Sequence, residues 1–480
     1  MKKSIGKLIC APNQNYFFDA VVNQIVPLSD NSFEQASRLL QGEECGVLTG
    51  EIQELIEQGF FSDSPVEKIV HPYEKYLPLI LSRTLNHITL QVTQNCNLRC
   101  KYCIYSVGDG ANQRHHSAKR MDWQTAKQAV DFLWEHSIDS DEISIGFYGG
   151  EPLLERPLLE KVVEYANERF EGKCIRYNIT TNGTLLNDEN ISFLAENQIS
   201  LMVSLDGPKL IHDRNRVFPD GKGSFDVVME RISRVKLLYP EYAKHMSFSM
   251  VMDPENDFDC INQIHLDGSV ITKYNLRSTF VERIDENANV SMQAEENFFE
   301  KFSYQEFLAW LSYLGRYPIE KVSAISYQAL LHSLGIVFRS RGAATLQKVD
   351  CPSGSCIVGK QRLFCSIDGT LFPCERINEC SQAMHIGNIF SGLDIEQALH
   401  LLKVGSLTPE ECKKCWAFRF CSLCAKKADI GERNLSEAKK LSACVEAKSN
   451  AFNALRNWVL DLELRENYRE QLIPVTEEEL

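Results

Sequence analysis

Apolar runs that alternate with amphipathic segments fill the middle of the chain, from residue 86 to about residue 290. Segments of helical period lie between the runs; in residues 122–134, for example, Ala126, Ala129, Val130 and Leu133 share one face. Strands that alternate with helices are typical of parallel sheets, so we expect an open six-stranded α/β barrel here. The six expected strands cover residues 88–93, 142–148, 175–181, 200–205, 246–252 and 276–281.

The pattern is different in residues 1–85. Short strand-like runs at 8–10 and 16–26 come first and are separated by a turn. Two helical segments follow, of which the first is capped at Asp30 and the second ends at Gly59. Strands followed by short helices in so short a segment predict a winged-helix-like domain.

Three further regions follow the barrel. Residues 291–345 are expected to form a helical connector, 346–450 hold many cysteines, and 451–480 are expected to form a charged helix with an acidic tail. Aromatic residues recur at helical spacing in the connector, and this spacing predicts that they pack in a core. They are Phe298, Phe299, Phe302, Phe307, Trp310 and Tyr313.

Composition narrows the class of protein. A chain of 480 residues with 44% hydrophobic and 24% charged residues is typical of globular proteins of two or three domains. The net charge of -14 disfavours nonspecific binding to nucleic acid or to anionic membranes. No long apolar run or signal segment is present, so we expect a cytoplasmic protein whose thiols are reduced and free for metal or redox chemistry.

Of the seventeen cysteines, thirteen lie in residues 96–103 and 351–444. The first group, Cys96, Cys100 and Cys103, is spaced C-x3-C-x2-C directly after the first barrel strand. Three thiolates on one loop can bind three irons of a 4Fe-4S cluster and leave the fourth open for chemistry. A structural zinc loop, disulfides and buried free thiols are the alternatives.

This loop, with Tyr102 at its aromatic position, resembles the signature of the radical S-adenosylmethionine (SAM) superfamily. The resemblance implies a partial (β/α)6 TIM barrel over residues 86–290. It also implies that the open iron chelates SAM, and that electron transfer into SAM releases a 5′-deoxyadenosyl radical that abstracts a hydrogen atom.

Further motifs follow successive strands, where functional loops of such barrels gather. Gly149, Gly150 and Glu151 resemble the family segment that holds the SAM amino group. The same resemblance assigns Asn182, Ser204 and Arg216 to the polar ends of SAM, and a guanidinium suits its carboxylate. We interpret His212, by contrast, as a structural histidine.

In the second group, Cys356, Gly369 and Cys374 are spaced C-x12-G-x4-C, and the cysteines from Cys412 to Cys424 are spaced C-x2-C-x5-C-x2-C, with a further cysteine at 444. This pattern resembles the SPASM domain, which carries auxiliary 4Fe-4S clusters in radical SAM enzymes that act on peptides. One departure is that two residues, rather than three, separate Cys421 from Cys424. Cys365 and Cys380 have no place in the pattern. The resemblance implies three clusters in all, with one auxiliary site formed by Cys356, Cys374 and Cys424, with or without Cys351, and the other by Cys412, Cys415, Cys421 and Cys444.

In position and pattern, residues 1–85 resemble the peptide-recognition element at the front of many radical SAM peptide maturases. That element binds a leader peptide by adding it as a strand to the edge of a sheet. Together these features predict a maturase that forms thioether cross-links in a Cys-containing, ribosomally made precursor peptide, with flavodoxin or ferredoxin as electron donor. Carbon-carbon or carbon-oxygen cross-linking is an alternative. Anaerobic sulfatase maturation is another, although that family has Asp as a base where this chain has Glu375. A zinc-dependent DNA-binding regulator is the alternative outside this class.

Overall fold

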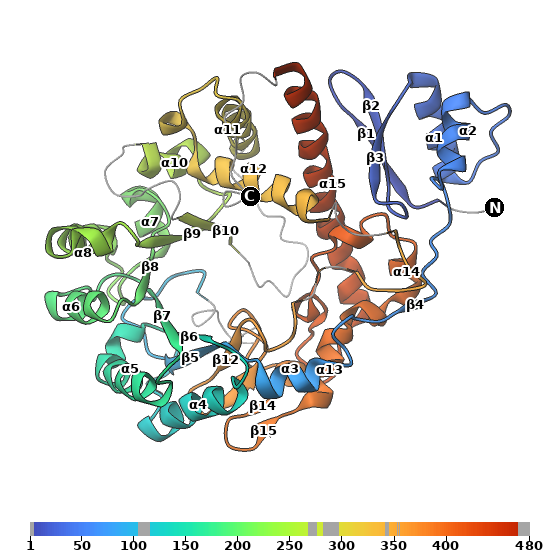
Figure 1. Cartoon of the computed structure of the whole chain (residues 1–480). Helices are drawn as coiled ribbons and strands as arrows, with labels where there is room; N and C mark the ends of the chain where they lie inside the picture. Colours follow the sequence, from blue (N-terminus) through green and yellow to red (C-terminus); the bar gives the residue numbers. More distant parts are fainter. Residues whose placement is uncertain are drawn as a thin grey trace.

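The computed structural model describes residues 4–103, 116–266, 276–281, 297–340, 345–352, 354 and 356–468. Six parallel strands lie side by side in chain order and form the expected open barrel (Figure 1). The α/β prediction is confirmed. The strands are β5 (His87–Thr93), β6 (Glu142–Gly149), β7 (Cys174–Thr181), β8 (Ser200–Ser204), β9 (Ser247–Met252) and β10 (Leu276–Phe280).

Helices cover the outer face of these strands (Figure 1). Asp122 caps the first of them by accepting a hydrogen bond from the Thr125 N–H, and the helix starts at the next residue. The helices of this layer are α4 (Trp123–His136), α5 (Arg156–Arg169), α6 (Asp188–Glu196), α7 (Lys209–Asn215), α8 (Phe225–Leu238), α9 (Pro240–Ala243) and α10 (Phe258–Leu266), with a short 3-10 turn at Pro152–Glu155.

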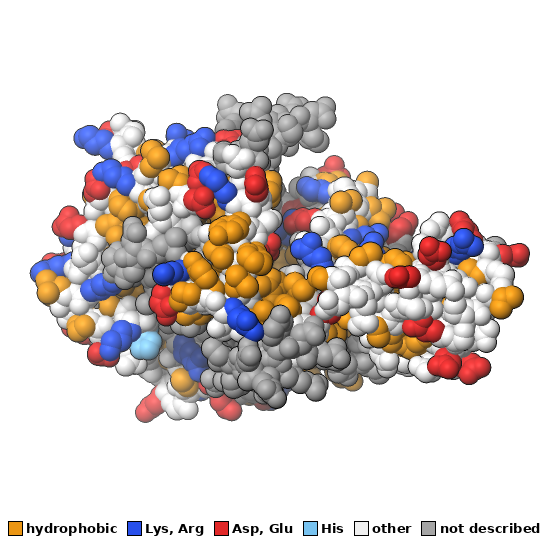
Figure 2. Space-filling view, turned by 90° about the horizontal axis from the view of Figure 1, so that it is seen from above, with side chains coloured by type: hydrophobic (Ala, Val, Ile, Leu, Met, Phe, Trp, Pro, Cys, Tyr) orange, Lys and Arg blue, Asp and Glu red, His pale blue; other side chains and the backbone are white. Residues whose placement is uncertain are grey.

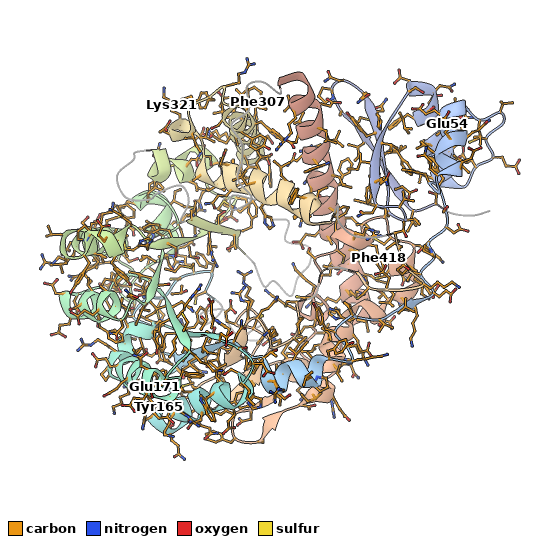
Figure 3. All side chains as sticks on the ribbon, in the orientation of Figure 1. Glu54, Tyr165, Glu171, Phe307, Lys321 and Phe418 are labelled. Carbon is orange, nitrogen blue, oxygen red and sulfur yellow. The ribbon has the colours of Figure 1, made fainter. Side chains whose placement is uncertain are left out.

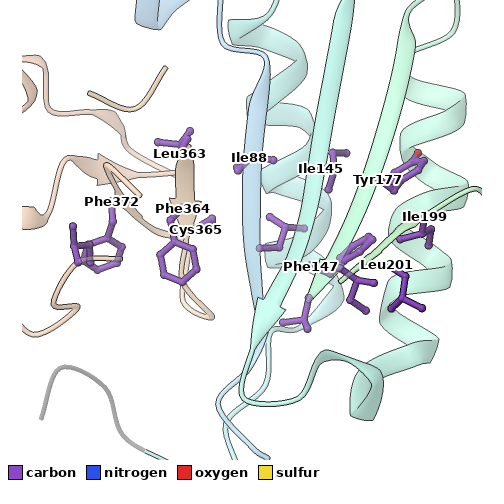
Figure 4. Packing of buried hydrophobic residues seen from close by; sticks show 14 of the residues in the cluster. Ile88, Ile145, Phe147, Tyr177, Ile199, Leu201, Leu363, Phe364, Cys365 and Phe372 are labelled. Carbon is purple, nitrogen blue, oxygen red and sulfur yellow. The ribbon is translucent and has the colours of Figure 1, made fainter. Parts of the chain in front are cut away.

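The two faces of the strands differ in polarity. In β5, Ile88 and Leu90 are fully buried with Ile145, Phe147 and other apolar residues of the neighbouring strands (Figure 4). Burial of each such side chain contributes about 1.5–3 kcal/mol. Because side chains alternate along a strand, the intervening residues, such as Gln91, project to the opposite face. The inner face of the barrel is therefore polar.

The sheet continues beyond the barrel into the cysteine-rich region. Strand β12 (Leu363–Cys365) pairs in parallel with β5, and three short antiparallel strands extend the sheet to ten strands. The core that lies behind the barrel strands includes Leu363 and Phe372 (Figure 4). Strands of two or three residues are too short to show a hydrophobic period in the sequence. The added strands are β13 (Thr370–Phe372), β14 (Gly387–Asn388) and β15 (Gly392–Leu393).

The N-terminal part forms a separate antiparallel sheet in the order β1-β2-β3, followed by two helices. Phe17 packs on the helices, whereas its neighbour Phe18 faces the opposite way and joins a core with Phe420 and Leu455. The sheet is thereby packed between its own helices and the C-terminal part of the chain. The elements are β1 (Gly6–Cys10), β2 (Asn15–Asp19), β3 (Gln24–Leu28), α1 (Asp30–Gln41) and α2 (Gly50–Glu57).

Three long helices connect the barrel, at β10, with the N-terminal sheet (Figure 1). They are α11 (Phe298–Tyr313), α12 (Ala324–Ser340) and α15 (Glu437–Tyr468). The expected packing of the aromatic residues of α11 is only partly correct. Phe298, Trp310 and Tyr313 are buried, but Phe299 and Phe307 are 54% and 56% exposed. Phe307 lies at the outer rim in Figure 3, and Figure 2 shows hydrophobic side chains gathered on this face. Both lie on the side of α11 away from the core, since a helix buries one stripe.

Short elements complete the chain. Among the described residues, no helix has the length and apolarity needed to cross a membrane. The predicted acidic tail, residues 469–480, lies outside the described residues. The remaining elements are β4 (Lys68–Ile69), which pairs with β11 (Val349–Asp350), α3 (Leu77–Arg83), α13 (Ile395–Leu402), α14 (Pro409–Lys413), and 3-10 turns at Ile319–Lys321, Gln382–Met384, Lys403–Leu407, Phe418–Phe420 and Ala425–Ala428.

Candidate functional site

The three-cysteine loop lies at the carboxyl end of β5. Cys100 is buried, Cys96 and Cys103 are half-buried, and none of the three is in a disulfide. Burial raises the pKa of Cys96 to about 12, and part of this shift comes from the Glu151 carboxylate and from the thiols of Cys100 and Cys103, because like charges repel. The three sulfurs are thus close enough to interact and form one thiol group.

Gly149 and Gly150, at the end of β6, pack against the backbone that leads into this loop. The Gly150 N–H donates to the Thr93 carbonyl and the Glu151 N–H donates to the Asn95 carbonyl, both at 2.9 Å. A Cβ on Gly150 would lie 2.1 Å from the Asn95 oxygen. The glycines are therefore needed for the close approach of two backbone segments, a requirement that exists without any ligand.

Glu151 is fully buried, and burial raises its pKa. Its carboxylate accepts hydrogen bonds from the Thr181 hydroxyl at 2.7 Å, the Asn182 N–H at 2.8 Å and the Leu153 N–H at 3.1 Å. These bonds connect the end of β6 to the end of β7. A carboxylate has about four acceptor sites, so one is left for a ligand such as an ammonium group.

Asn182 connects the β7 loop to the cysteine loop. Its amide nitrogen donates to the Asn97 side chain at 2.8 Å and points to the Cys96 sulfur at 3.8 Å. Its amide oxygen accepts from the Thr184 hydroxyl at 2.6 Å. Asn182 therefore fixes the position of the first cysteine of the loop.

Asp206, which the sequence motifs did not single out, is the centre of a buried polar cluster next to Ser204. Its carboxylate pairs with Arg216 Nε at 2.9 Å, accepts from the Tyr102 hydroxyl, and accepts from the Val251 N–H at 3.1 Å. The Arg216 guanidinium also lies over the Tyr102 ring, 5.5 Å from its centroid. A charged residue directly after a barrel strand was the one signal in the sequence that pointed to it.

Arg216 retains capacity for a ligand. Within the described part of the chain, hydrogen bonds of its guanidinium go only to Asp206, through Nε. Its terminal nitrogens can therefore meet a carboxylate. His212 lies behind this cluster, where burial lowers its pKa to about 4 and its ring bonds Ser224 at 2.9 Å, as expected for a structural histidine.

The cysteines of the C-terminal region fall into two groups. In the first, Cys424 interacts electrostatically with both Cys356 and Cys374, and burial together with Cys424 raises the pKa of Cys374 to about 11. Cys365 lies apart, fully buried in the barrel core, and Cys380 is exposed.

The second group contains Cys412, Cys415, Cys421 and Cys444. Burial raises the pKa of Cys421 to about 11, and the other three thiols add to this shift. Cys351 interacts with Cys412 and Cys421 and packs against the same core as Cys412 and Cys415. The structure therefore places Cys351 beside the second group, whereas Cys374 packs on the barrel core.

Glu375 lies near the amino end of β5, where its charge acts on His87. Its carboxylate is paired with Arg362, whose Nε is 3.1 Å away, and Arg376 Nε lies within 3.8 Å. The carboxylate is therefore engaged with guanidinium groups near the amino end of β5, whereas the three-cysteine loop lies at its carboxyl end, and this placement does not favour the base role that its sequence position suggested.

The thiols are of the ligand type that iron-sulfur clusters use, because thiolates are the usual protein ligands of 4Fe-4S clusters. Such a cluster spreads its thiolate ligands over several irons. The grouping of the loop thiols and of the C-terminal thiols, and their partial burial, fit ligands of this kind. Among the described residues, no set of three or more His, Cys, Asp or Glu side chains is close enough to hold one metal ion.

Comparisons with known proteins agree with this arrangement. Residues 90–265 match the family model described as the radical SAM superfamily. An uncharacterized protein of Methanocaldococcus jannaschii is 40% identical over 140 residues, which are 29% of this chain and 45% of that protein, so the chain spans less than half of it. A cysteine-type anaerobic sulfatase-maturating enzyme of Clostridium perfringens is 24% identical over 68% of this chain and 85% of that enzyme.

A solved structure described as native anSMEcpe with bound AdoMet shares the fold. It has a TM-score of 0.56 and 21% identity, and the match covers 80% of this chain and all of that one. The predicted fold is thereby confirmed.

Proposed function

We propose that this chain is a radical SAM maturase that installs thioether cross-links in a Cys-containing, ribosomally made precursor peptide. The proposal assigns 1–85 to peptide recognition, 86–290 to radical generation, 291–345 to a connector, 346–450 to auxiliary clusters, and 451–480 to a terminal helix and tail.

Cys96, Cys100 and Cys103 would hold the first 4Fe-4S cluster. The acceptor site of Glu151 that no described residue uses suits the ammonium group of SAM, and the terminal nitrogens of Arg216, which bond no described residue, suit its carboxylate. When SAM is bound and the cluster has received an electron from flavodoxin or ferredoxin, this centre would supply a carbon radical that abstracts a hydrogen atom. Asp206 and Asn182 hold the loops that present these groups in place.

The observation that carries the thioether assignment is the division of the C-terminal thiols. Cys356, Cys374 and Cys424 form a three-thiol group, because Cys351 lies with the other group. Three protein thiolates leave one iron of a four-iron cluster without a protein ligand. A cysteine thiolate of the peptide can occupy that position, beside the route by which the surplus electron leaves.

The N-terminal sheet supports a peptide as the substrate. Among the described strands, β3 pairs only with β2, so its other edge is free to accept an extended peptide. Pro27 interrupts the donors of this edge, which limits nonspecific pairing. A pocket of about 320 Å³ lies beside the start of β3 and can receive an apolar side chain; it is lined by Phe18, Asn23, Gln24, Ile25, Val337, Phe420, Leu455, Trp458 and Leu462.

Relatives whose names state an activity also support a maturase, since one group is named for the maturation of sulfatases. They include the sulfatase-maturating enzymes and a radical SAM cyclopropyl synthase of Paramaledivibacter caminithermalis, which is 27% identical over 44% of this chain. Sulfatase maturation is the second candidate, since the match to the Clostridium perfringens enzyme extends over 85% of that enzyme. The guanidinium-paired Glu375 and the N-terminal sheet weigh against it.

The test uses the anaerobically reconstituted enzyme, SAM, a reductant and short Cys-containing peptides encoded beside its gene. Thioether formation predicts a peptide that loses two hydrogen atoms per link and one free thiol. Formation of an aldehyde from Cys or Ser would favour sulfatase maturation, and carbon-carbon or carbon-oxygen cross-links would leave all thiols free.

Deletion of residues 1–85 should weaken peptide binding much more than SAM cleavage without peptide, and unchanged peptide affinity would contradict the recognition role.

A further inference from the structure

A buried lysine lies against the second group of C-terminal thiols. Lys440, near the start of α15, is only 3% exposed. Its ammonium nitrogen donates to the Thr408 hydroxyl at 2.7 Å, the Gly405 carbonyl at 3.4 Å and the Cys412 sulfur at 3.5 Å. An ammonium group has three hydrogens, so this set of acceptors uses all of them.

Within the described part of the chain, no carboxylate balances this charge. Across the described residues, no Asp or Glu oxygen lies within 4.0 Å of the Lys440 nitrogen. A buried cation that meets only neutral groups is costly, and natural proteins rarely leave one without an opposite charge. The group that Lys440 faces is therefore expected to be an anion.

The thiols supply such an anion once they bind metal. Cys444 follows Lys440 by one helical turn, and Cys412 is in contact with it. A 4Fe-4S cluster with four thiolate ligands carries net negative charge, and its thiolates are acceptors for N–H and O–H groups.

Thr408 adds a second contact to the same sulfur. Its hydroxyl oxygen accepts from Lys440 and lies 3.5 Å from the Cys412 sulfur. Since its oxygen already accepts from the ammonium group, its hydrogen is available to the sulfur. Lys440 and Thr408 thus form one polar unit that ends on Cys412.

We propose that Lys440 is a positioning residue for the auxiliary cluster held by Cys412, Cys415, Cys421 and Cys444. Together with Thr408, it hydrogen-bonds the Cys412 ligand and thereby raises the reduction potential of this cluster. The inference rests on the proposed auxiliary cluster. Reduction adds one negative charge to the cluster. A buried cation in contact with a ligand sulfur stabilises the reduced form more than the oxidised form.

The experiment compares full-length proteins reconstituted with iron and sulfide, all carrying Cys96→Ala, Cys100→Ala and Cys103→Ala so that only auxiliary signals remain. Lys440→Met removes the charge at nearly constant length, and Lys440→Arg keeps it. Lys448→Met is the matched control, because Lys448 is exposed on the same helix and interacts with Cys415 and Cys444 from solvent. Iron and sulfide contents and potentiometric titrations followed by electron paramagnetic resonance are the readouts.

We expect Lys440→Met to lower the midpoint potential of one auxiliary couple and leave the other unchanged. Lys440→Arg should restore most of the difference, and Lys448→Met should change little. Loss of iron from Lys440→Met but not from Lys440→Arg would also support the assignment, because only Lys440→Arg keeps the positive charge.

Unchanged potentials in Lys440→Met would overturn the inference, as would equal shifts in Lys440→Met and Lys448→Met, because the contact would then be irrelevant. Loss of iron from both Lys440 variants would assign the residue to structure alone. Failure of the underlying cluster is distinguishable. In that case Cys412→Ala would leave the iron content of the parent protein unchanged, and both proposals would fall.

Discussion

Replacement of Asp206 by Asn should loosen the loops around the three-cysteine group. The side chains of Asp206 and Arg216 are 2% and 10% exposed, so the substitution leaves a guanidinium buried without its counter-charge. Loss of one partner from a buried ion pair costs about 3–5 kcal/mol. An Asn side chain has nearly the same shape, so the loss reports on charge rather than packing.

Hydrogen exchange of backbone amides is the appropriate assay, because a chain of several domains does not unfold in one step. The amide of Val251 donates to the Asp206 carboxylate at 3.1 Å and reports directly on this region. A loss of about 3 kcal/mol corresponds to exchange about a hundredfold faster. Amides of the N-terminal sheet should not change.

The matched control is Asp188→Asn. Asp188 also pairs with an arginine, Arg234, but the two side chains are 58% and 39% exposed. Exposed pairs contribute about 0–1 kcal/mol, so exchange near Asp188 should rise less than about fivefold. Equal, small effects of Asp206→Asn and Asp188→Asn would refute the claim that the Asp206 pair organises the site.

Two further predictions concern the cysteine loop. Gly150→Ala should displace the loop backbone, which lies 2.1 Å from the added Cβ, and should lower iron binding at this site. The control is Gly46→Ala, whose added Cβ has no atom within 4 Å and should leave the iron content unchanged. Equal iron contents of the two variants would contradict the importance of the Gly150 contact. In reduced, cluster-free protein, burial raises the pKa of Cys96 and Cys100 to about 12 and about 11. The fold therefore favours their neutral thiols, which contribute stability below about pH 9 that is lost as the pH rises through 11–12. Because thiolates are the nucleophiles, alkylation of both at pH 8 should be far slower than that of exposed Cys174, and equal rates by mass spectrometry would contradict this.

The sequence predicts the features that depend on local pattern. Strands of five to eight residues with alternating polarity and helices capped like α4 at Asp122 could be located from periodicity. The cysteine loop and the glycine pair could be located because their function requires fixed spacing. Strand β12 could not, because three residues show no period, although it joins the cysteine-rich region to the barrel sheet.

Contacts between distant residues were also beyond the sequence. Asp206 and Arg216 are ten residues apart and face each other only because β8 and α7 fold back on one another. Lys440 reads as one of several lysines on a charged helix, yet its partner Cys412 lies 28 residues before it. The exposed Phe299 and Phe307 share the helical spacing of the buried Phe298, and spacing alone does not say which face of α11 packs.

The central claim is that Cys96, Cys100 and Cys103 hold a cluster that cleaves SAM. The most direct measurement is the amount of 5′-deoxyadenosine formed by the anaerobically reconstituted, reduced enzyme and by the variant with all three cysteines replaced by Ala. We expect the enzyme to form 5′-deoxyadenosine and the variant to form none while it keeps the iron of its C-terminal thiols. Cleavage by the variant, or an enzyme that binds zinc alone, would contradict it.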